Sequence, residues 1–294
     1  MNEALRAAIE HALGATVVDG RPVGGGSIAS ASRLQLDDGR RVFLKVLTHQ
    51  AGDFSEEAAG LSRLRAVGAL RVPEVLAHGS EGGTRFLLLE WIASGRSAKD
   101  YSQALGRGLA QLHRDSASDR CGLEHDNHIG ATPQPNHWGD DWIAFWRERR
   151  LGYQLALAQR KGVADGRLTS AVQAVIDAAA DIAAPTADEP MSLLHGDLWS
   201  GNVMTDEGGS PVLIDPAIYF GHREAELGMT RLFGGFGENF YRAYDAAWPL
   251  AAGWRERLPL YALYHALNHL NLFGGGYYDA SLGQAERALA VARI

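Results

Sequence analysis

Two carboxylates and an amide follow one another in the chain at spacings that suit phosphoryl transfer from a nucleotide. Asp197 comes just after the apolar run 192–194, Asn202 lies five residues further on, and Asp215 follows the apolar run 212–214. A carboxylate at the end of a strand-like segment can orient an acceptor hydroxyl and take up its proton. A carboxamide oxygen and a second carboxylate can hold Mg²⁺ on the phosphates of ATP. The pattern predicts Asp197 as the catalytic base, with Asn202 and Asp215 as metal ligands.

A lysine and a glutamate in the first third of the chain are candidates for binding the phosphates. Lys45 lies in the apolar strand-like run 41–47, where an inward-facing ammonium needs an anionic partner. Glu57 shares a helical stripe with Leu61 and Leu64, so it points towards the core with them. We expect Lys45 and Glu57 to pair and to bind the α- and β-phosphates of ATP. The alternative for either residue alone is a solvated surface position.

Two backbone segments are candidates for the rest of the nucleotide. The first is a glycine-rich run whose N–H groups could close over phosphates, formed by Gly24, Gly25, Gly26 and Ser27. A glycine triplet is weak evidence, because it is more often a plain turn. The second segment ends a predicted strand, where backbone groups could bind the adenine edge, and comprises Glu90, Trp91 and Ile92. This second assignment depends on position alone.

The elements that must position these groups change in character along the chain. The first part alternates turns with short apolar strands and contains one helix, residues 56–67, for which Asp53 and Ser55 are N-cap candidates. After the small polar linker 93–97, apolar stripes at helical spacing predominate, such as Leu105, Leu109 and Leu112. We therefore predict an α+β class, namely a bilobal protein-kinase-like fold with a small β-rich lobe and a larger α-helical lobe.

The linker sets the expected domain boundary. We assign residues 1–92 to an N-terminal ATP-binding lobe and residues 93–294 to a C-terminal lobe for catalysis and substrate binding. Ligand pockets favour such junctions, so the linker is the expected position of the cleft. Within the first lobe, Asp37, Asp38 and Gly39 predict a hairpin turn.

The composition restricts the partners. Hydrophobic residues make up 46% and charged residues 21% of the 294 residues, which is typical of a soluble enzyme. The formal net charge of -7 argues against nucleic acid and anionic membranes, and no apolar run approaches the length of a membrane span. The single cysteine, Cys121, excludes an intramolecular disulfide and fits a reducing compartment. We predict a cytoplasmic protein without a nucleic-acid or membrane partner, and its oligomeric state stays open.

Three other polar patterns are assigned to structure. His265 and His269 are one helical turn apart, but no glutamate follows His265 in the zincin manner and the surrounding helix is apolar. The loop 125–128 is interpreted as a structured loop rather than a ligand set. The mixed charges of residues 147–150 are interpreted as a solvated or packing face.

Further motifs carry a family resemblance. They are residues 24–28, 54–61, 125–130, 132–136, 145–151, 195–202, 215–217 and 221–227. With these motifs the chain resembles the fructosamine kinase (ketosamine-3-kinase) family, a branch of the aminoglycoside-phosphotransferase-like group within the protein-kinase-like fold. The triplet His-Gly-Asp alone would fit many small-molecule kinases. The Trp-Ser-Gly sequence that follows it and the His-Asp-Asn loop are far more specific.

The resemblance implies a reaction and roles for the residues. The family transfers the γ-phosphoryl group of ATP to the C3 hydroxyl of a ketosamine, a sugar attached to a small amine or to a protein lysine. A C3 phosphate next to the C2 ketone becomes a leaving group on enolisation towards C1, so elimination releases the amine and repairs the glycation. Carried over, Asp197 is the base, Asn202 and Asp215 hold Mg²⁺, and Lys45 with Glu57 holds phosphates.

Two departures from related patterns affect regulation. Asp215 is followed by Pro-Ala where protein kinases have Phe-Gly, so no phenylalanine flip between active and inactive states is expected. Ser27 stands where many family members have cysteine, so control through a disulfide at that loop is not expected.

Substrate contacts leave alternatives open. Trp199 could stack on the sugar or on the amine-bearing group, or it could pack the catalytic loop. Asp126, Arg223 and Glu224 are further candidates for which structure is favoured over substrate binding. The competing functions are a kinase for another hydroxylated amine, such as an aminoglycoside or a choline-like metabolite, and a nucleotide-binding pseudokinase. Retention of all five polar residues argues against the pseudokinase, and the specific loops argue against the aminoglycoside substrate.

Overall fold

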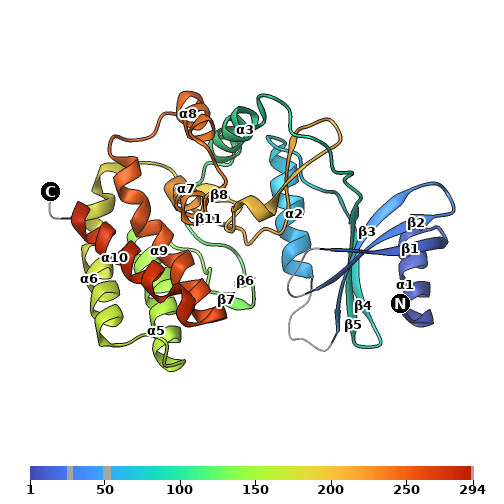
Figure 1. Ribbon diagram of the computed structural model, residues 1–294, viewed down its shortest axis with the longest axis horizontal. Coiled ribbons are helices and arrows are strands. Elements are labelled where there is room, and N and C mark those ends of the chain that lie inside the picture. Colours follow the sequence, from blue (N-terminus) through green and yellow to red (C-terminus); the bar gives the residue numbers. More distant parts are fainter. Residues whose placement is uncertain (25–28, 49–53, 293–294) are drawn as a thin grey trace. The chain divides into compact units, whose positions relative to one another are not determined.

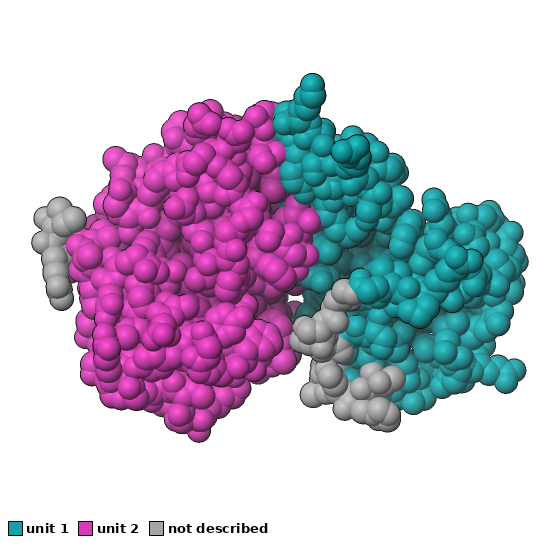
Figure 2. All heavy atoms as spheres, viewed as in Figure 1, with its two compact units in different colours: residues 1–101, 204–215 teal, residues 102–203, 216–294 magenta. Residues whose placement is uncertain are grey.

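The computed structural model describes residues 1–24, 29–48 and 54–292, which fall into two units (Figure 1). Unit 1 contains residues 1–101 and 204–215, shown in teal in Figure 2. Unit 2, in magenta, contains residues 102–203 and 216–294. Strands dominate the first unit and helices the second, which confirms the predicted α+β class.

Unit 1 is built on a five-stranded antiparallel sheet in the order β1-β2-β3-β5-β4. The strands are β1 (Val17–Val23), β2 (Ser30–Leu36), β3 (Arg41–Thr48), β4 (Val75–Glu81) and β5 (Thr84–Glu90). The predicted hairpin at residues 37–39 joins β2 to β3, and Gly39 has a φ of 88° that a glycine adopts without strain. The central position of β3 places Lys45 between Ala31 of β2 and Leu87 of β5.

Two helices complete the first part of unit 1. Helix α1 (Glu3–Leu13) packs its apolar face, with Ile9 fully buried, against sheet residues such as Val42 and Leu44. Because strand side chains alternate, Lys45 points to the opposite face from Leu44. Helix α2 (Ser55–Val67) confirms the predicted helix. Its N-cap is Phe54, so the prediction for Ser55 is wrong because Ser55 is already the first helical residue, and Asp53 lies outside the described residues.

A distant hairpin also belongs to unit 1. Strands β9 (Val203–Thr205) and β10 (Pro211–Leu213) form it, and Leu213 donates its N–H to the carbonyl of Arg71 at 3.0 Å. The Arg71 guanidinium bonds Asp206 at 2.6 Å and Glu90 at 2.8 Å. The units therefore differ from the expected division at residue 92, because these bonds tie residues 204–215 to the sheet.

Unit 2 is mainly helical. Its α-helices are α3 (Tyr101–Asp115), α4 (Trp142–Phe145), α5 (Tyr153–Arg160), α6 (Gly166–Ala183), α7 (Arg223–Leu232), α8 (Glu238–Ala247), α9 (Trp254–Phe273) and α10 (Tyr278–Val291). A π-helical turn, η1 (Trp146–Gly152), joins α4 to α5, and short 3-10 turns are η2 (Ala184–Thr186), η3 (Ser200–Asn202) and η4 (Gly275–Tyr277). Short strands pair as β6 (Asn127–Ile129) with β7 (Thr132–Gln134) and as β8 (Ser192–Leu194) with β11 (Tyr219–Gly221).

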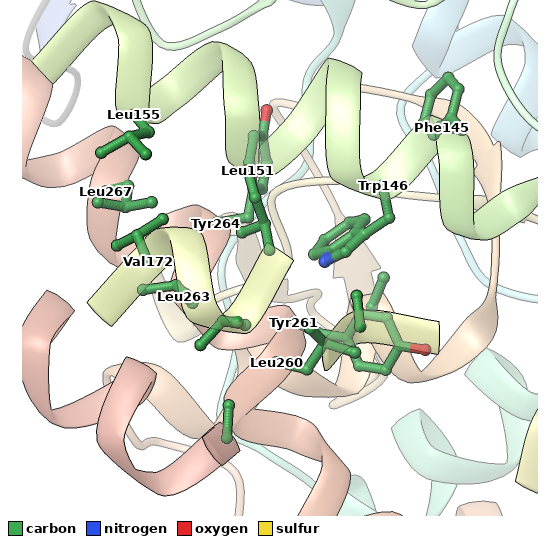
Figure 3. Packing of buried hydrophobic residues seen from close by; sticks show 14 of the residues in the cluster. Phe145, Trp146, Leu151, Leu155, Val172, Leu260, Tyr261, Leu263, Tyr264 and Leu267 are labelled. Atoms are coloured by element: carbon green, nitrogen blue, oxygen red, sulfur yellow. The ribbon is translucent and has the colours of Figure 1, made fainter. Parts of the chain in front are cut away.

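Helix α9 is the centre of the core of unit 2. It is buried almost all round, as its apolar residues predicted. Its Tyr261 packs edge-on against Trp146 of η1, with 5.1 Å between the ring centroids (Figure 3). Leu263 and Leu267 pack in the same cluster with Val172 of α6. This packing gives a fixed base for the short strands and loops that carry the polar groups. No helix in the described ranges is long and apolar enough to cross a membrane.

Candidate active site

In unit 1, three of the expected residues meet. The Lys45 ammonium donates to Glu57 Oε1 at 2.7 Å and also to Asp215 Oδ1. Burial by itself would lower the pKa of Lys45, but the carboxylates of Glu57 and Asp215 outweigh it and raise that pKa above its ordinary value. Lys45 is therefore a fixed cation held by β3, α2 and the end of the distant hairpin. The predicted pairing of Lys45 with Glu57 is confirmed.

The backbone at Asp215 is strained. Its φ is 54°, and Asp215 is the only non-glycine residue with a positive φ among the residues that the structure describes. A side chain in this region costs free energy, which surrounding structure must offset, and such residues cluster at functional sites. Asp215 comes two residues after β10 ends at Leu213, and the turned backbone directs its carboxylate to Lys45.

In unit 2, Asn202 holds Asp197. The Asn202 side-chain amide donates to the carbonyl oxygen of Asp197 at 2.8 Å and to its carboxylate Oδ2 at 3.1 Å. The N–H of Trp199 bonds the Asp197 carbonyl at 3.1 Å, and the N–H of Asn202 bonds the carbonyl of Trp199 at 2.9 Å. This tight turn follows β8, as the strand-like run predicted. The loop therefore fixes the direction of one carboxylate.

Glu226 of α7 binds the backbone just before Asp197, and the sequence analysis did not identify this residue. Its carboxylate accepts the N–H of His195 at 2.5 Å and the N–H of Gly196 at 3.1 Å, and its side chain is fully buried. His113 Nε2 lies 3.7 Å from the same carboxylate, and burial lowers the pKa of His113. Glu226 lies inside the motif 221–227, but a glutamate among helical residues carries no signal that it is buried.

Gly196 allows close packing of the segment that follows Asp215. Its φ is 83°, and a Cβ at this position would lie 1.9 Å from the carbonyl oxygen of Ala217. The Ala217 N–H also donates to the carbonyl of His195 at 2.8 Å. The chain just after Asp215 is thereby bound to the chain just before Asp197.

The His-Asp-Asn loop and β7 supply a buried amide network that holds the same segment. Asn127 donates to the carbonyl of Ile218 at 2.8 Å, and Gln134 donates to that of Ala217 at 3.1 Å. Asn136 bonds Asn127 at 2.6 Å, and further bonds come from Arg150 and Tyr264. Residues 125 and 126 are in a loop, whereas residues 127 and 128 belong to β6, so the interpretation of 125–128 as a loop holds for its first half, and the bonds of Asn127 are structural.

The predicted nucleotide-binding segments are placed only in part. Gly24 is exposed next to β1, whereas Gly25, Gly26 and Ser27 lie outside the described residues. The Glu90 carboxylate is bonded to Arg71, and the N–H of Glu90 donates to the carbonyl of Glu74 at 2.8 Å. The Trp91 ring lies 5.8 Å from the Arg33 guanidinium, and Ile92 is buried. Adenine binding by residues 90–92 stays a prediction.

The four substrate candidates separate into two kinds. Trp199 is 39% exposed, and Asp126 accepts the N–H of Asn136 at 2.7 Å from a half-exposed side chain. Arg223 and Glu224 are buried in salt bridges, Arg223 with Glu189 at 2.7 Å and Glu224 with Arg257 at 2.5 Å. These bonds support the structural alternative for Arg223 and Glu224.

Asp215 of unit 1 and Asn202 of unit 2 each carry an oxygen of a type that Mg²⁺ accepts. Asp215 brings a carboxylate, and the Asn202 amide that donates to Asp197 also carries a carbonyl oxygen, and both are ligand types that Mg²⁺ accepts. Among the described residues, no group of three or more His, Cys, Asp or Glu side chains is placed to hold a metal ion. His269 Nδ1 lies 2.8 Å from the carbonyl oxygen of His265, which is a bond within the helix.

A lysine–glutamate pair under a small antiparallel sheet, together with an Asp–Asn loop in a helical unit, defines a phosphotransferase with a protein-kinase-like fold. The aminoglycoside phosphotransferase APH(4)-Ia shares that fold, with a TM-score of 0.64 and 19% identity over 99% of this chain and 98% of its own. The chain belongs to the fructosamine kinase family, whose model matches residues 1–290.

Individual relatives agree with this membership. A probable ketoamine kinase of Synechocystis sp. is 42% identical over 272 residues, which are 92% of this chain and 90% of the relative. The chloroplastic protein-ribulosamine 3-kinase of Arabidopsis thaliana is 42% identical over 88% of this chain and 79% of its own. The crystal structure of a candidate fructosamine-3-kinase from Thermobifida fusca has a TM-score of 0.89 and 32% identity, covering 99% of this chain and all of the other.

Proposed function

We propose that this protein is an ATP-dependent ketosamine 3-kinase, which transfers the γ-phosphoryl group of ATP to the C3 hydroxyl of a fructosamine or ribulosamine. Membership of the fructosamine kinase family supports the reaction class. The observation that carries the proposal is the bond from the Asn202 amide to the Asp197 carboxylate within the family's specific loop. That bond leaves Asp197 in a defined direction, as a base that must meet one hydroxyl requires.

Each polar residue has a proposed role. Asp197 accepts the proton of the C3 hydroxyl. The C3 oxygen bonds to the γ-phosphorus, and the bond between that phosphorus and the ADP oxygen breaks. Lys45, kept protonated by its carboxylate neighbours, binds phosphate oxygens, while Glu57 holds the lysine in place. Asn202 and Asp215 hold Mg²⁺, which when bound neutralises charge on the phosphates. The segments 24–27 and 90–92 enclose the phosphates and the adenine.

Glu226, Asn127 and Gln134 act through the backbone. They bond His195, Gly196, Ala217 and Ile218, and these residues precede Asp197 or follow Asp215. Their proposed role is to hold the two carboxylates in position, since a displacement of about 1 Å can cost a hundredfold in rate.

The product accounts for a role in deglycation. A phosphate at C3 lies next to the C2 ketone, so loss of a C1 proton and elimination of inorganic phosphate leave a conjugated imine between C1 and the amine. Water hydrolyses this imine and frees the amine without further help from the enzyme. The cytoplasmic location predicted from the single cysteine stays part of the proposal, and the Arabidopsis relative is named as chloroplastic.

One experiment tests the proposal. The protein is incubated with ATP and Mg²⁺ and with ribulosamines, fructosamines, an aminoglycoside or choline in parallel. ADP release is followed, and phosphorus NMR locates the new phosphate. We expect turnover only with the ketosamines and phosphate on C3. Turnover of the aminoglycoside or choline, with none of any ketosamine, would refute the proposal.

A further inference from the structure

Exposed aromatic side chains gather in one place on unit 2. The described residues expose five large hydrophobic side chains, and three of them are Trp199, Phe233 and Phe273, at 39, 40 and 62% exposure. Two half-buried rings, His269 and Tyr277, lie among them. We call these five residues the aromatic patch. Single exposed apolar residues are ordinary, whereas a contiguous group marks a binding surface.

The rings form a continuous row. Trp199 meets Phe233 edge-on at 6.5 Å between ring centroids, and Phe233 lies 4.5 Å from His269. His269 lies 5.6 Å from Phe273 and 5.2 Å from Tyr277. The row therefore runs from the catalytic loop, past the end of α7, to the end of α9 and to η4.

The row is fixed to the loop that carries Asp197. The Trp199 ring lies so close over Gly201 that a Cβ there would be 2.3 Å from it. The turn after α7 packs on the same loop, because a Cβ at Gly235 would be 2.6 Å from the Cβ of Ser200. The N–H of Trp199 bonds the carbonyl of Asp197 itself. The aromatic patch therefore begins two residues from the catalytic base and is packed on the same loop.

The chemistry of a ketosamine places its amine near this surface. Four bonds separate the C3 oxygen from the amine nitrogen, which is a distance of about 5 Å. A substrate whose C3 hydroxyl contacts Asp197 therefore extends its amine, and the group on that amine, over the surface around the loop. Aromatic faces bind ammonium groups and apolar chains alike. Burial lowers the pKa of His269, so the row is uncharged at neutral pH.

We propose that the aromatic patch is the subsite for the group carried by the ketosamine amine. It selects ketosamines whose amine bears an aromatic or long aliphatic group, such as the methylene chain of a lysine, over those of methylamine. The inference rests on the proposed function and adds a preference on the amine side, which the sugar and the C3 hydroxyl do not determine.

The test compares three ribulosamines that differ only in the amine, namely those of methylamine, butylamine and benzylamine. We expect kcat/KM for the butylamine and benzylamine derivatives to exceed that for the methylamine derivative by about three- to tenfold. Phe233→Ala and Phe273→Ala should lower kcat/KM for the benzylamine derivative by about two- to tenfold, mainly through a higher KM. The same variants should change kcat/KM for the methylamine derivative by less than about twofold.

Two kinds of control separate binding from folding. Phe233→Tyr and Phe273→Tyr keep the rings and should keep the preference. Val18→Ala removes an exposed apolar side chain of β1, outside the aromatic patch, and should leave kcat/KM unchanged for both the benzylamine and the methylamine derivative. Equal kcat/KM for all three ribulosamines, or equal losses for the benzylamine and methylamine derivatives in the alanine variants, would overturn the subsite while the kinase proposal stands. If wild type phosphorylates no ketosamine, neither these ribulosamines nor the fructosamines of the same amines, both proposals fail.

Discussion

Glu226 accepts the backbone N–H of His195 at 2.5 Å, and this bond joins the first turn of helix α7 to the residue two before Asp197. The same carboxylate also takes the N–H of Gly196, so two buried donors depend on one side chain. Buried N–H groups that lose their acceptor cost more free energy than the bond itself contributes. The loop therefore depends on a residue that we do not expect to touch any substrate.

Replacing Glu226 should separate loop position from overall stability. Glu226→Ala leaves two buried donors without their acceptor and should lower the free energy of unfolding by about 2–5 kcal/mol. Glu226→Gln keeps one acceptor oxygen and should lose less stability but still reduce kcat. Urea unfolding and steady-state kinetics measure the two effects. If Glu226→Gln matched wild type in kcat and Glu226→Ala matched it in stability, the support role would be disproved.

Replacing Asp197 should remove the base alone. Asp197→Asn keeps the size of the side chain and an oxygen that can accept the Asn202 amide, so the loop should fold as before. We expect kcat to fall by about 10²–10⁴ while ATP still binds. ADP release measures the first quantity and calorimetric titration the second. Near-wild-type turnover in this variant would remove Asp197 from the mechanism.

Replacing Asp215 should affect metal-bound nucleotide specifically. Asp215→Asn removes one anionic oxygen, so it should weaken binding of Mg·ATP more than binding of metal-free ATP. It also removes one of the two carboxylates that Lys45 contacts. The matched control is Glu57→Gln, which disturbs the same lysine and should weaken both forms of the nucleotide similarly. Equal losses for the two nucleotide forms in Asp215→Asn would contradict the metal assignment.

Local sequence signals predicted much of this arrangement. The periodicity that set Glu57 in line with Leu61 and Leu64 identified the partner of Lys45, because a helix repeats its faces every three to four residues. Turn chemistry located the hairpin at residues 37–39. The spacing from Asp197 to Asn202 pointed to a catalytic pair, and the structure shows the two residues in one hydrogen-bonded turn.

What the sequence did not predict depends on contacts between distant residues. Arg71 bonds Asp206 across 135 residues, and this bond helps to place residues 204–215 with the sheet. The burial of charged side chains could not be predicted either, because Glu226 looks like a surface glutamate in the sequence and is buried only once α7 has packed. The aromatic patch gathers residues from the positions just before η3 and just after α7, and from α9 and η4, and its members are ordinary core candidates until the fold exposes them. Their proposed roles leave no local sequence pattern that would distinguish these residues from ordinary core residues.

A buried histidine should make stability depend on pH. Burial lowers the pKa of His265 from 6.5 to about 3, with His269 and Arg150 adding in the same direction. Between these two values the unfolded chain binds a proton that the folded protein excludes. Stability from this group is therefore complete above pH 6.5 and is lost as the pH falls towards 3, by about 1.4 kcal/mol per pH unit.

Urea unfolding at pH 6.5, 5.5 and 4.5 measures this slope. His265→Gln removes the titrating ring, so the loss of stability per pH unit should be smaller than in wild type by about 1.4 kcal/mol. His11→Gln, which changes an exposed histidine of α1, is the matched control and should leave the slope as in wild type. The comparison uses differences in slope because His265→Gln also disturbs packing at every pH. Parallel curves for wild type and His265→Gln would show that this histidine takes up its proton equally in both states.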